Sequence, residues 1–156
     1  MLTWKEFSRA RPDLAEAGRG LLYQFGVGLG FLATVATDGF PRTHAVRPVV
    51  TSDGIYLYVM PGPKLRDLRR DGKYALHCFP PIDNEDVFHI TGIAKELDDG
   101  SLREAVDRTL MTESNLDELN PEHRKHPLFE LLIRGVLLTR TTGHGDYHPQ
   151  HTIWKA

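Results

Sequence analysis

Residues 29–60 read LGFLATVATDGFPRTHAVRPVVTSDGIYLYVM, and this stretch decides the fold. It is rich in β-branched and aromatic residues without a helical period, and two turn signals, Asp38-Gly39 and Ser52-Asp53-Gly54, divide it. The pattern predicts a meander of antiparallel strands at residues 29–37, 42–51 and 55–60. In the middle strand, alternation places Arg42, His44, Val46 and Pro48 on one face and Thr43, Ala45, Arg47 and Val49 on the other.

The segments on either side of the meander add helices and further strands. Pro61-Gly62-Pro63-Lys64 breaks the sheet, and residues 64–70 fit a short helix with Leu65 and Leu68 turned inward. More strands are predicted at residues 73–79, 87–97 (with Gly92 as a bulge), 136–142 and 152–155. Helices are predicted from Thr3, from Pro12 to Phe25, and over 101–111 after a capping box at Ser101. Residues 112–127 read as a loop or a short helix.

These elements predict a mainly β fold with peripheral helices. Five to seven antiparallel strands with one short helix inserted between the third and the fourth favour a small barrel over a parallel sheet, which would alternate strand and helix throughout. A chain of 156 residues is long enough for one domain with its own core. We expect a single domain over 1–156, with helices in 1–27, the barrel core in 28–97, and a helix and closing strands in 98–156.

Charge and hydropathy exclude several classes of protein. The chain has 19 Lys+Arg against 21 Asp+Glu, a net charge of −2, which argues against a dedicated nucleic-acid binder. No stretch approaches the roughly 18 apolar residues that a membrane span needs. The amino terminus has no basic segment followed by an apolar one, so no secretion signal is predicted. A single cysteine, Cys78, fits a reducing compartment, and we expect a cytoplasmic protein.

One anion site is suggested by two neighbouring segments. Lys64 stands in the first turn of the predicted helix, where backbone N–H groups and the helix dipole already favour negative charge, so a bound anion would remove the conflict. Arg42 on the neighbouring strand would complete a phosphate site by a forked contact. The alternative is that these cations form a solvated basic face.

Other chemistry has less support in the sequence. His144, His148 and His151 share one loop, but their spacing matches no metal motif, and no metal is predicted. Cys78 lies in an apolar strand, where inert cysteines occur, and no serine stands in a nucleophile elbow. There is no Walker or Rossmann phosphate loop. No catalytic side chain is assigned, and if the protein is an enzyme, we expect a cofactor to carry the reaction.

The ordered set of segments resembles the pyridoxamine 5′-phosphate oxidase-like family of FMN-binding split barrels. The segments that carry the resemblance are Gly30–Val35, Asp38–Arg42, Gly54–Tyr58, Lys64–Asp71 and Phe88–Ala94. The resemblance implies an antiparallel split β-barrel and a homodimer, with a flavin mononucleotide in each of two grooves at the subunit interface. It also implies that Lys64 holds the flavin phosphate, with Arg42 and Pro63 beside it. The remaining residues that it assigns to cofactor binding are His44, Val46, Pro48, Tyr58, Val59 and Trp154.

Departures from the family pattern narrow the expected reaction. Pro63 stands where the true oxidases have an arginine, and Val87 or Phe88 stands where they have a glutamine. The chain also stops at Trp154-Lys155-Ala156, before the segment that recognises the substrate phosphate. We therefore expect no vitamin B6 oxidation, but an FMN-dependent transfer of hydride or electrons to or from a small molecule, with His44 or Tyr58 as candidate proton donors.

The alternatives are a deazaflavin-dependent reductase, or a non-enzymatic module that binds or senses flavin or haem or serves as a dimeric interaction domain. A haem version would need an axial ligand, for which His44, His77, His89 and the histidines of the carboxy-terminal loop are candidates.

Overall fold

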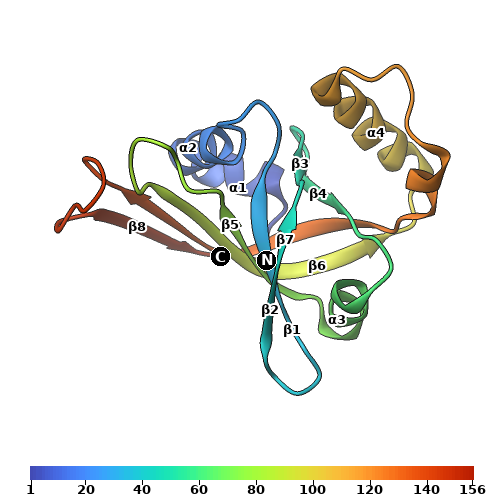
Figure 1. Ribbon diagram of the computed structural model, residues 1–156, viewed down its shortest axis with the longest axis horizontal. Coiled ribbons are helices and arrows are strands. Elements are labelled where there is room, and N and C mark those ends of the chain that lie inside the picture. Colours follow the sequence, from blue (N-terminus) through green and yellow to red (C-terminus); the bar gives the residue numbers. More distant parts are fainter.

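The computed structural model describes residues 1–156 as one curved antiparallel sheet flanked by helices (Figure 1). The strands are β1 (Gly30–Val35), β2 (Pro41–Val46), β3 (Val49–Val50), β4 (Ile55–Tyr58), β5 (Lys73–Cys78), β6 (Val87–Leu97), β7 (Leu128–Arg140) and β8 (Gln150–Lys155). The helices are α1 (Trp4–Ala10), α2 (Pro12–Leu22), α3 (Pro63–Asp71), α4 (Gly100–Ser114) and the 3-10 helix η1 (Pro121–Lys125). This arrangement confirms the mainly β prediction with peripheral helices. None of the helices has the length and apolar character needed to cross a bilayer.

The order of the strands differs from the predicted meander. Hydrogen-bonded neighbours follow the order β2-β1-β5-β6-β7-β4-β3, and β8 pairs with β7. The hairpin β1–β2 and the hairpin β3–β4 therefore lie at opposite ends of the order, and the prediction that they form one continuous meander is wrong. Strand β7 joins the two parts, because it pairs with β6 along one edge and, through its first residues, with β4 along the other. The second half of β7 pairs with β8. Since β2 and β3 are not paired, the barrel is open along one side.

The predicted strand 42–51 is broken at Arg47-Pro48. β2 ends at Val46, and β3 begins at Val49 beside β4. Pro48 has no N–H group to donate to a ladder, so the chain leaves one end of the sheet here and joins the other. The predicted alternation of faces consequently stops at Val46. Pro48 is buried, and its carbonyl lies so near Gly28 that a Cβ added there would be 1.9 Å from the oxygen.

Other boundaries were predicted with mixed success. The inserted helix and the bulge are confirmed: α3 buries Leu65 and Leu68, and the β6–β7 register shifts between Thr91 and Gly92. The capping box at Ser101 is wrong, because the N-cap of α4 is Asp99, whose carboxylate accepts hydrogen bonds from the backbone N–H groups of the next turn. Strand β7 begins at Leu128, eight residues before the predicted start at 136.

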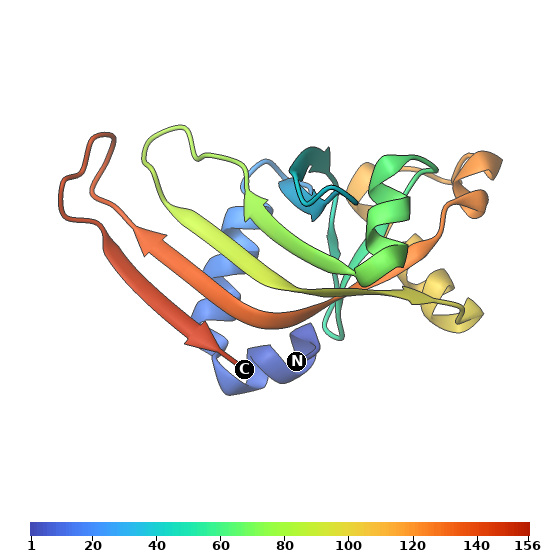
Figure 2. The same ribbon diagram turned by 90° about the horizontal axis from the view of Figure 1, so that it is seen from below.

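Two clusters of buried side chains hold these elements together. The larger lies inside the sheet, where α1 and α2 cover one side of β6 and β7 (Figure 2) and contribute Trp4, Phe7, Leu14 and Leu22. The smaller joins α4 to β3, β4 and β7 through Val49, Tyr56, Val106, Leu110 and Leu128. Because α4 packs on this second cluster, it lies beside the β3–β4 hairpin, near the gap that the open barrel leaves.

Candidate functional site

The start of α3 places Lys64 at the edge of the open barrel. Gly62 is the N-cap with φ +154° and gives no side-chain cap, Pro63 occupies the first turn, and Gly72 ends the helix in the left-handed region. Lys64 is half-buried, and its ammonium makes no hydrogen bond or ion pair with any other side chain. Burial lowers the pKa of this ammonium. A partly desolvated cation without a partner is therefore present where the sequence predicts the anion site.

The neighbouring Arg42 is engaged by a carboxylate. Its Nη1 lies 3.6 Å from Oδ2 of Asp67, a buried residue of α3. The same carboxylate accepts hydrogen bonds from Thr34 Oγ1 at 3.0 Å and Arg70 Nη1 at 3.2 Å. Burial alone would raise the pKa of Asp67, but these hydrogen bonds and the charge of Arg42 outweigh it and hold the pKa below its ordinary value. Arg42 thus braces β2 against α3, and 39% of its side chain stays exposed.

Two further polar side chains around the β2–β3 junction have buried atoms without hydrogen bonds. Nε2 of His44 is buried without a hydrogen bond, and burial, followed by the charge of Lys64, lowers the pKa of this ring. Nε and Nη2 of Arg47 are also buried without hydrogen bonds, and Nη2 lies 3.8 Å from Oε2 of Glu113 on α4. Hydrogen-bonding capacity therefore remains free in β2, at His44, and at Arg47, which directly follows β2.

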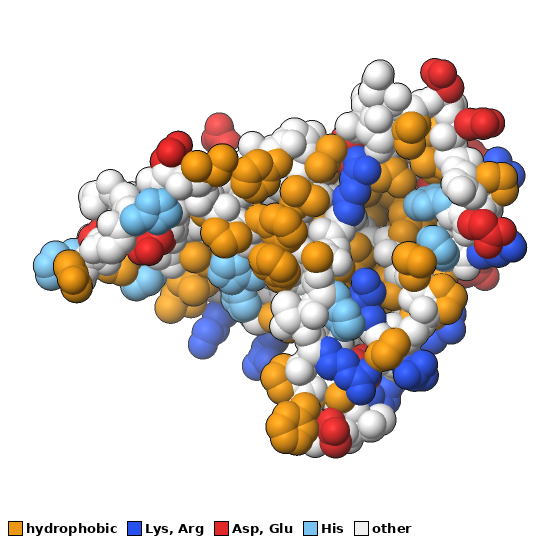
Figure 3. Space-filling model, viewed as in Figure 1, with side chains coloured by type: hydrophobic (Ala, Val, Ile, Leu, Met, Phe, Trp, Pro, Cys, Tyr) orange, Lys and Arg blue, Asp and Glu red, His pale blue; other side chains and the backbone are white.

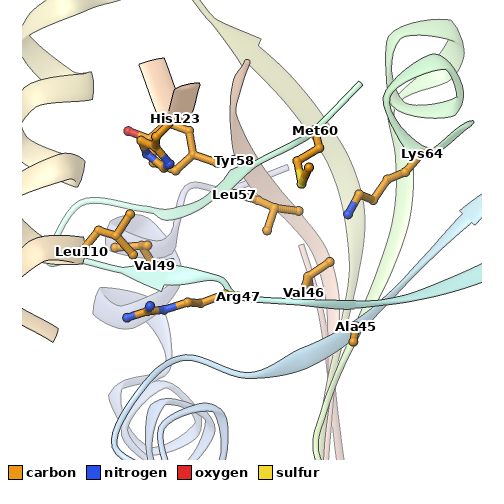
Figure 4. Close-up of a pocket in the computed structure, with 10 residues that line it drawn as sticks. All are labelled: Ala45, Val46, Arg47, Val49, Leu57, Tyr58, Met60, Lys64, Leu110 and His123. Atoms are coloured by element: carbon orange, nitrogen blue, oxygen red, sulfur yellow. The ribbon is translucent and has the colours of Figure 1, made fainter. Parts of the chain in front are cut away.

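A cavity of about 320 Å³ lies between β2, β3, β4, α3 and the α4 region. Figure 4 shows Lys64 at one end and Tyr58 with His123 at the other, with aliphatic side chains between them. The ten lining residues are Ala45, Val46, Arg47, Val49, Leu57, Tyr58, Met60, Lys64, Leu110 and His123. The arrangement suits a ligand that has an anionic group and a flat apolar body.

The predicted site residues are divided between this cavity and other places. Val46, Tyr58 and Lys64 line the cavity, whereas Arg42, His44 and Pro63 lie around the start of α3 without lining it. Pro48 and Val59 are buried, Val59 in the main core. Trp154 is on β8, where its ring packs 5.0 Å from that of Phe7, and it does not line this cavity.

The cavity also contains residues that the sequence did not single out as site residues. Ala45 lies on the β2 face opposite to the predicted one, and Arg47 and Val49 come after the end of β2. His123 belongs to the segment predicted as loop or short helix. Tyr58 donates a hydrogen bond from its hydroxyl to Asp107 Oδ1 at 2.5 Å, and burial raises the pKa of this phenol above its ordinary value. The sequence of this segment contains two histidines three residues apart, His123 and His126, which distinguish it from the polar residues around them.

The histidines of the carboxy-terminal loop do not converge. His144 Nε2 lies 2.8 Å from the carbonyl of Ile82, and His151 Nδ1 lies 2.9 Å from Thr139 Oγ1. No group of three or more His, Cys, Asp or Glu side chains has the arrangement of a metal site.

No protein-family model and no curated protein matches the chain. Solved structures do match its fold. A protein from Listeria innocua provisionally assigned as a pyridoxamine 5′-phosphate oxidase has a TM-score of 0.62 at 17% identity, over 79% of this chain and 95% of that one. A FAD-binding protein from Mesorhizobium loti has a TM-score of 0.55 at 22% identity, over 69% and 82%. A heme-binding protein from Mycobacterium smegmatis has a TM-score of 0.59 at 18% identity, over 87% of this chain and 57% of that one.

The fold is therefore an antiparallel split barrel of the pyridoxamine 5′-phosphate oxidase-like type, as the sequence predicts. The similar structures include flavin-binding and haem-binding proteins. At 17–22% identity, the property that these proteins share with the chain is the fold.

Proposed function

We propose that this chain binds flavin mononucleotide in the cavity between Lys64 and Tyr58, and transfers hydride or electrons to or from a small organic molecule. The observation that carries the proposal is the unpartnered, half-buried ammonium of Lys64 at one end of a largely apolar cavity. Desolvating a charge opposes folding unless a partner compensates for it, and a phosphate is the partner for which this position is suited.

The residues around Lys64 support the phosphate end. No side chain caps the first turn of α3, so the N–H groups of Lys64 and Leu65 remain without a side-chain partner. The free Nε2 of His44 and the exposed part of Arg42 supply further donors, although Arg42 is shared with Asp67. Pro63 in the first turn has no N–H group to lose and fixes the helix start.

The apolar middle of the cavity is suited to the flavin ring. Val46, Val49, Leu57 and Leu110 give it apolar walls, and Met60 adds an adaptable thioether side chain. A flavin, when bound, supplies hydride and one-electron chemistry that side chains do not. Lys64 and its neighbours would hold the phosphate, and the apolar walls would exclude water from the ring. Tyr58 and His123 would face a small molecule bound beside the ring.

A homodimer is part of the proposal, and the exposed surface supports it. The isolated chain exposes 8789 Å², against about 7,900 Å² for a typical monomer of this mass. Figure 3 shows hydrophobic side chains gathered over β1, β5 and the loop after β5. Phe31 on β1 is 36% exposed and stacks on Phe79, with ring centroids 4.4 Å apart, and nearby Phe25 and Ile82 are 43% and 76% exposed. A second copy of the chain would cover this patch.

Phe31→Glu tests the dimer. The charge would be buried in the interface, so we expect the variant to sediment as a monomer of 17.6 kDa at concentrations where the unmodified protein is dimeric. Leu116→Glu, a change at an exposed position after α4, should leave the mass unchanged. A monomeric unmodified protein, or equal behaviour of the two variants, would refute this interface.

The visible absorption spectrum tests the cofactor. After excess FMN is added and unbound flavin is removed, we expect a two-band flavin spectrum at about one FMN per subunit. A Soret band in the purified protein would move the assignment to haem, and a protein that retains only an added deazaflavin would move it to a deazaflavin-dependent reductase. A colourless protein that retains none of these would leave the fold standing and refute the cofactor.

The cytoplasmic location stays a prediction, which rests on the single buried Cys78.

A further inference from the structure

Three polar side chains from three different elements meet at the end of the cavity opposite Lys64. Tyr58 comes from β4, Asp107 from α4 and His123 from η1. Asp107 Oδ1 accepts the hydrogen bond from the Tyr58 hydroxyl at 2.5 Å and lies 3.4 Å from Nε2 of His123. The rings of Tyr58 and His123 are in edge contact, with centroids 4.0 Å apart, and both line the cavity (Figure 4).

The segment that carries His123 is held in place by Arg103. The Nη2 atom of Arg103 donates to the backbone carbonyls of His123, Arg124 and His126 at 3.1, 3.2 and 2.8 Å. The same guanidinium lies 4.9 Å from the centre of the Tyr58 ring. Because its backbone is fixed from α4, His123 has the defined position that a reactive side chain needs, although the surrounding sequence is polar and aperiodic.

The two nitrogens of His123 have different surroundings. Nε2 is fully buried, makes no hydrogen bond of good geometry, and has the Asp107 carboxylate as its nearest charged neighbour. Nδ1 makes no hydrogen bond and is not fully buried, and the His123 ring lines the cavity. A neutral ring beside a carboxylate keeps its proton on the nitrogen nearer the negative charge, so Nδ1 carries the free lone pair.

The charges around the ring leave it neutral near pH 7. Burial lowers the pKa of His123, Asp107 raises it in part, and Arg103 and His126 lower it further. Tyr58, on β4, faces the ring as a neutral phenol, because burial raises its own pKa.

We propose that His123 is the proton-transfer residue of this cavity and that Asp107 is its positioning residue. The proposal rests on the proposed function, because it assumes a flavin between His123 and Lys64. The substrate it implies has an O–H or N–H group next to the C–H bond that reacts. A bound flavin would accept the hydride of this C–H bond on oxidation, the O–H or N–H proton would pass to His123 Nδ1, and a C=O or C=N double bond would form in the substrate. In the reverse reaction, the hydride and the proton would both return to the substrate. Asp107 stabilises the imidazolium form of His123 while it holds the proton.

The first test uses the protein without flavin. Long-range ¹H–¹⁵N spectra at pH 7.5 should show His123 as a neutral ring protonated on Nε2. Asp107→Asn should lower its pKa and populate both tautomers, whereas His126→Gln should leave the tautomer unchanged. A ring protonated on Nδ1, or an Asp107→Asn spectrum identical to that of the unmodified protein, would overturn the proposal whatever the cofactor is.

The second test uses the FMN-loaded protein and 4-nitrophenol, whose ionisation is visible by absorption. With a base at Nδ1, the bound phenol should ionise with a constant at least tenfold larger than in His123→Gln, while His126→Gln should match the unmodified protein. Failure of the protein to bind FMN refutes the proposed function and leaves the first test to decide on His123. A loaded protein that does not bind the phenol, or that ionises it equally in both variants, overturns the proposal itself.

Discussion

Replacing Lys64 by alanine removes the cation on which the flavin proposal depends. A hydrogen bond between a charged donor and an anion contributes about 1.5–3 kcal/mol, so the dissociation constant for FMN should rise about 13- to 160-fold at about 1.36 kcal/mol per factor of ten. Lys64 is half-buried and makes no ion pair within the chain, so no internal carboxylate competes for the phosphate and the full effect should appear in binding.

The same substitution should not weaken the unliganded protein. Burial lowers the pKa of Lys64 in the folded state, so the unfolded chain binds this proton more tightly and charging Lys64 opposes folding. This penalty is fully present below the lowered pKa and disappears as the pH rises to the ordinary value of 10.5. At neutral pH, the free energy of unfolding of Lys64→Ala should therefore equal or exceed that of the unmodified protein.

Urea unfolding with and without FMN measures both effects. At FMN equal to one hundred times its dissociation constant, the unmodified protein should gain about 2.7 kcal/mol, and a variant that binds about 30-fold more weakly should gain about 0.9 kcal/mol. Arg66→Ala is the matched control, because Arg66 is an exposed cation of α3 that does not line the cavity. An equal FMN-dependent gain in stability for Lys64→Ala and the unmodified protein would refute the role of Lys64 as phosphate anchor. The same conclusion would follow if Arg66→Ala lost as much of this gain as Lys64→Ala does.

Two further predictions concern the framework around the site. Gly18→Ala should lower the free energy of unfolding by about 1–3 kcal/mol, because its Cβ would lie 2.2 Å from the buried Phe88 ring. Gly20→Ala, two residues away and facing open space, should raise it by about 0.5–1 kcal/mol. Equal changes in urea unfolding would show that α2 does not pack as described. Asp67→Asn should cost about 2–3 kcal/mol at pH 7. Since the hydrogen bonds to Asp67 and the charge of Arg42 outweigh burial and hold its folded pKa below 3.8, this difference should shrink as the pH falls through that lower value. A difference that does not shrink as the pH is lowered below 3.8 would contradict the assignment.

Local sequence signals predicted the elements that local interactions determine. The inserted helix, predicted over 64–70 and observed as Pro63–Asp71, and the bulge at Gly92 both depend on residues within a few positions. Strand β7 was predicted only in part, because Leu128–Gly135 contains Leu, Glu and Arg residues that have no strong preference for strands. This segment becomes a strand because β7 pairs with β6 along eleven residues of each strand. Strand β6 is distant in the sequence, so a local pattern does not reveal this pairing.

The candidate site divides in the same way. Lys64 could be predicted because a cation in the first turn of a helix is unusual by itself, and the family resemblance gave it a role. Arg47, Asp107 and His123 could not, because this region brings together segments about 60 and 75 residues apart in the chain, and because β2 ends at Val46, where the predicted alternation of faces stops. Trp154, which the resemblance assigned to cofactor binding, has a structural contact in this fold, since its ring packs against that of Phe7.

Buried polar atoms without partners are rare in folded proteins, so their distribution indicates where a ligand belongs. In this chain, such side-chain atoms occur in five residues: Ser8, His44, Arg47, Glu113 and His123. Four of the five belong to the site, since Arg47 and His123 line the cavity, Glu113 is the neighbour of Arg47, and His44 lies beside Lys64. Each of these atoms costs stability in the free protein, and a bound molecule with acceptors at one end and a donor at the other would remove most of that cost at once. Ligand binding should for this reason stabilise the protein by more than the Lys64 contact alone, and the FMN-dependent gain that survives in Lys64→Ala measures the difference.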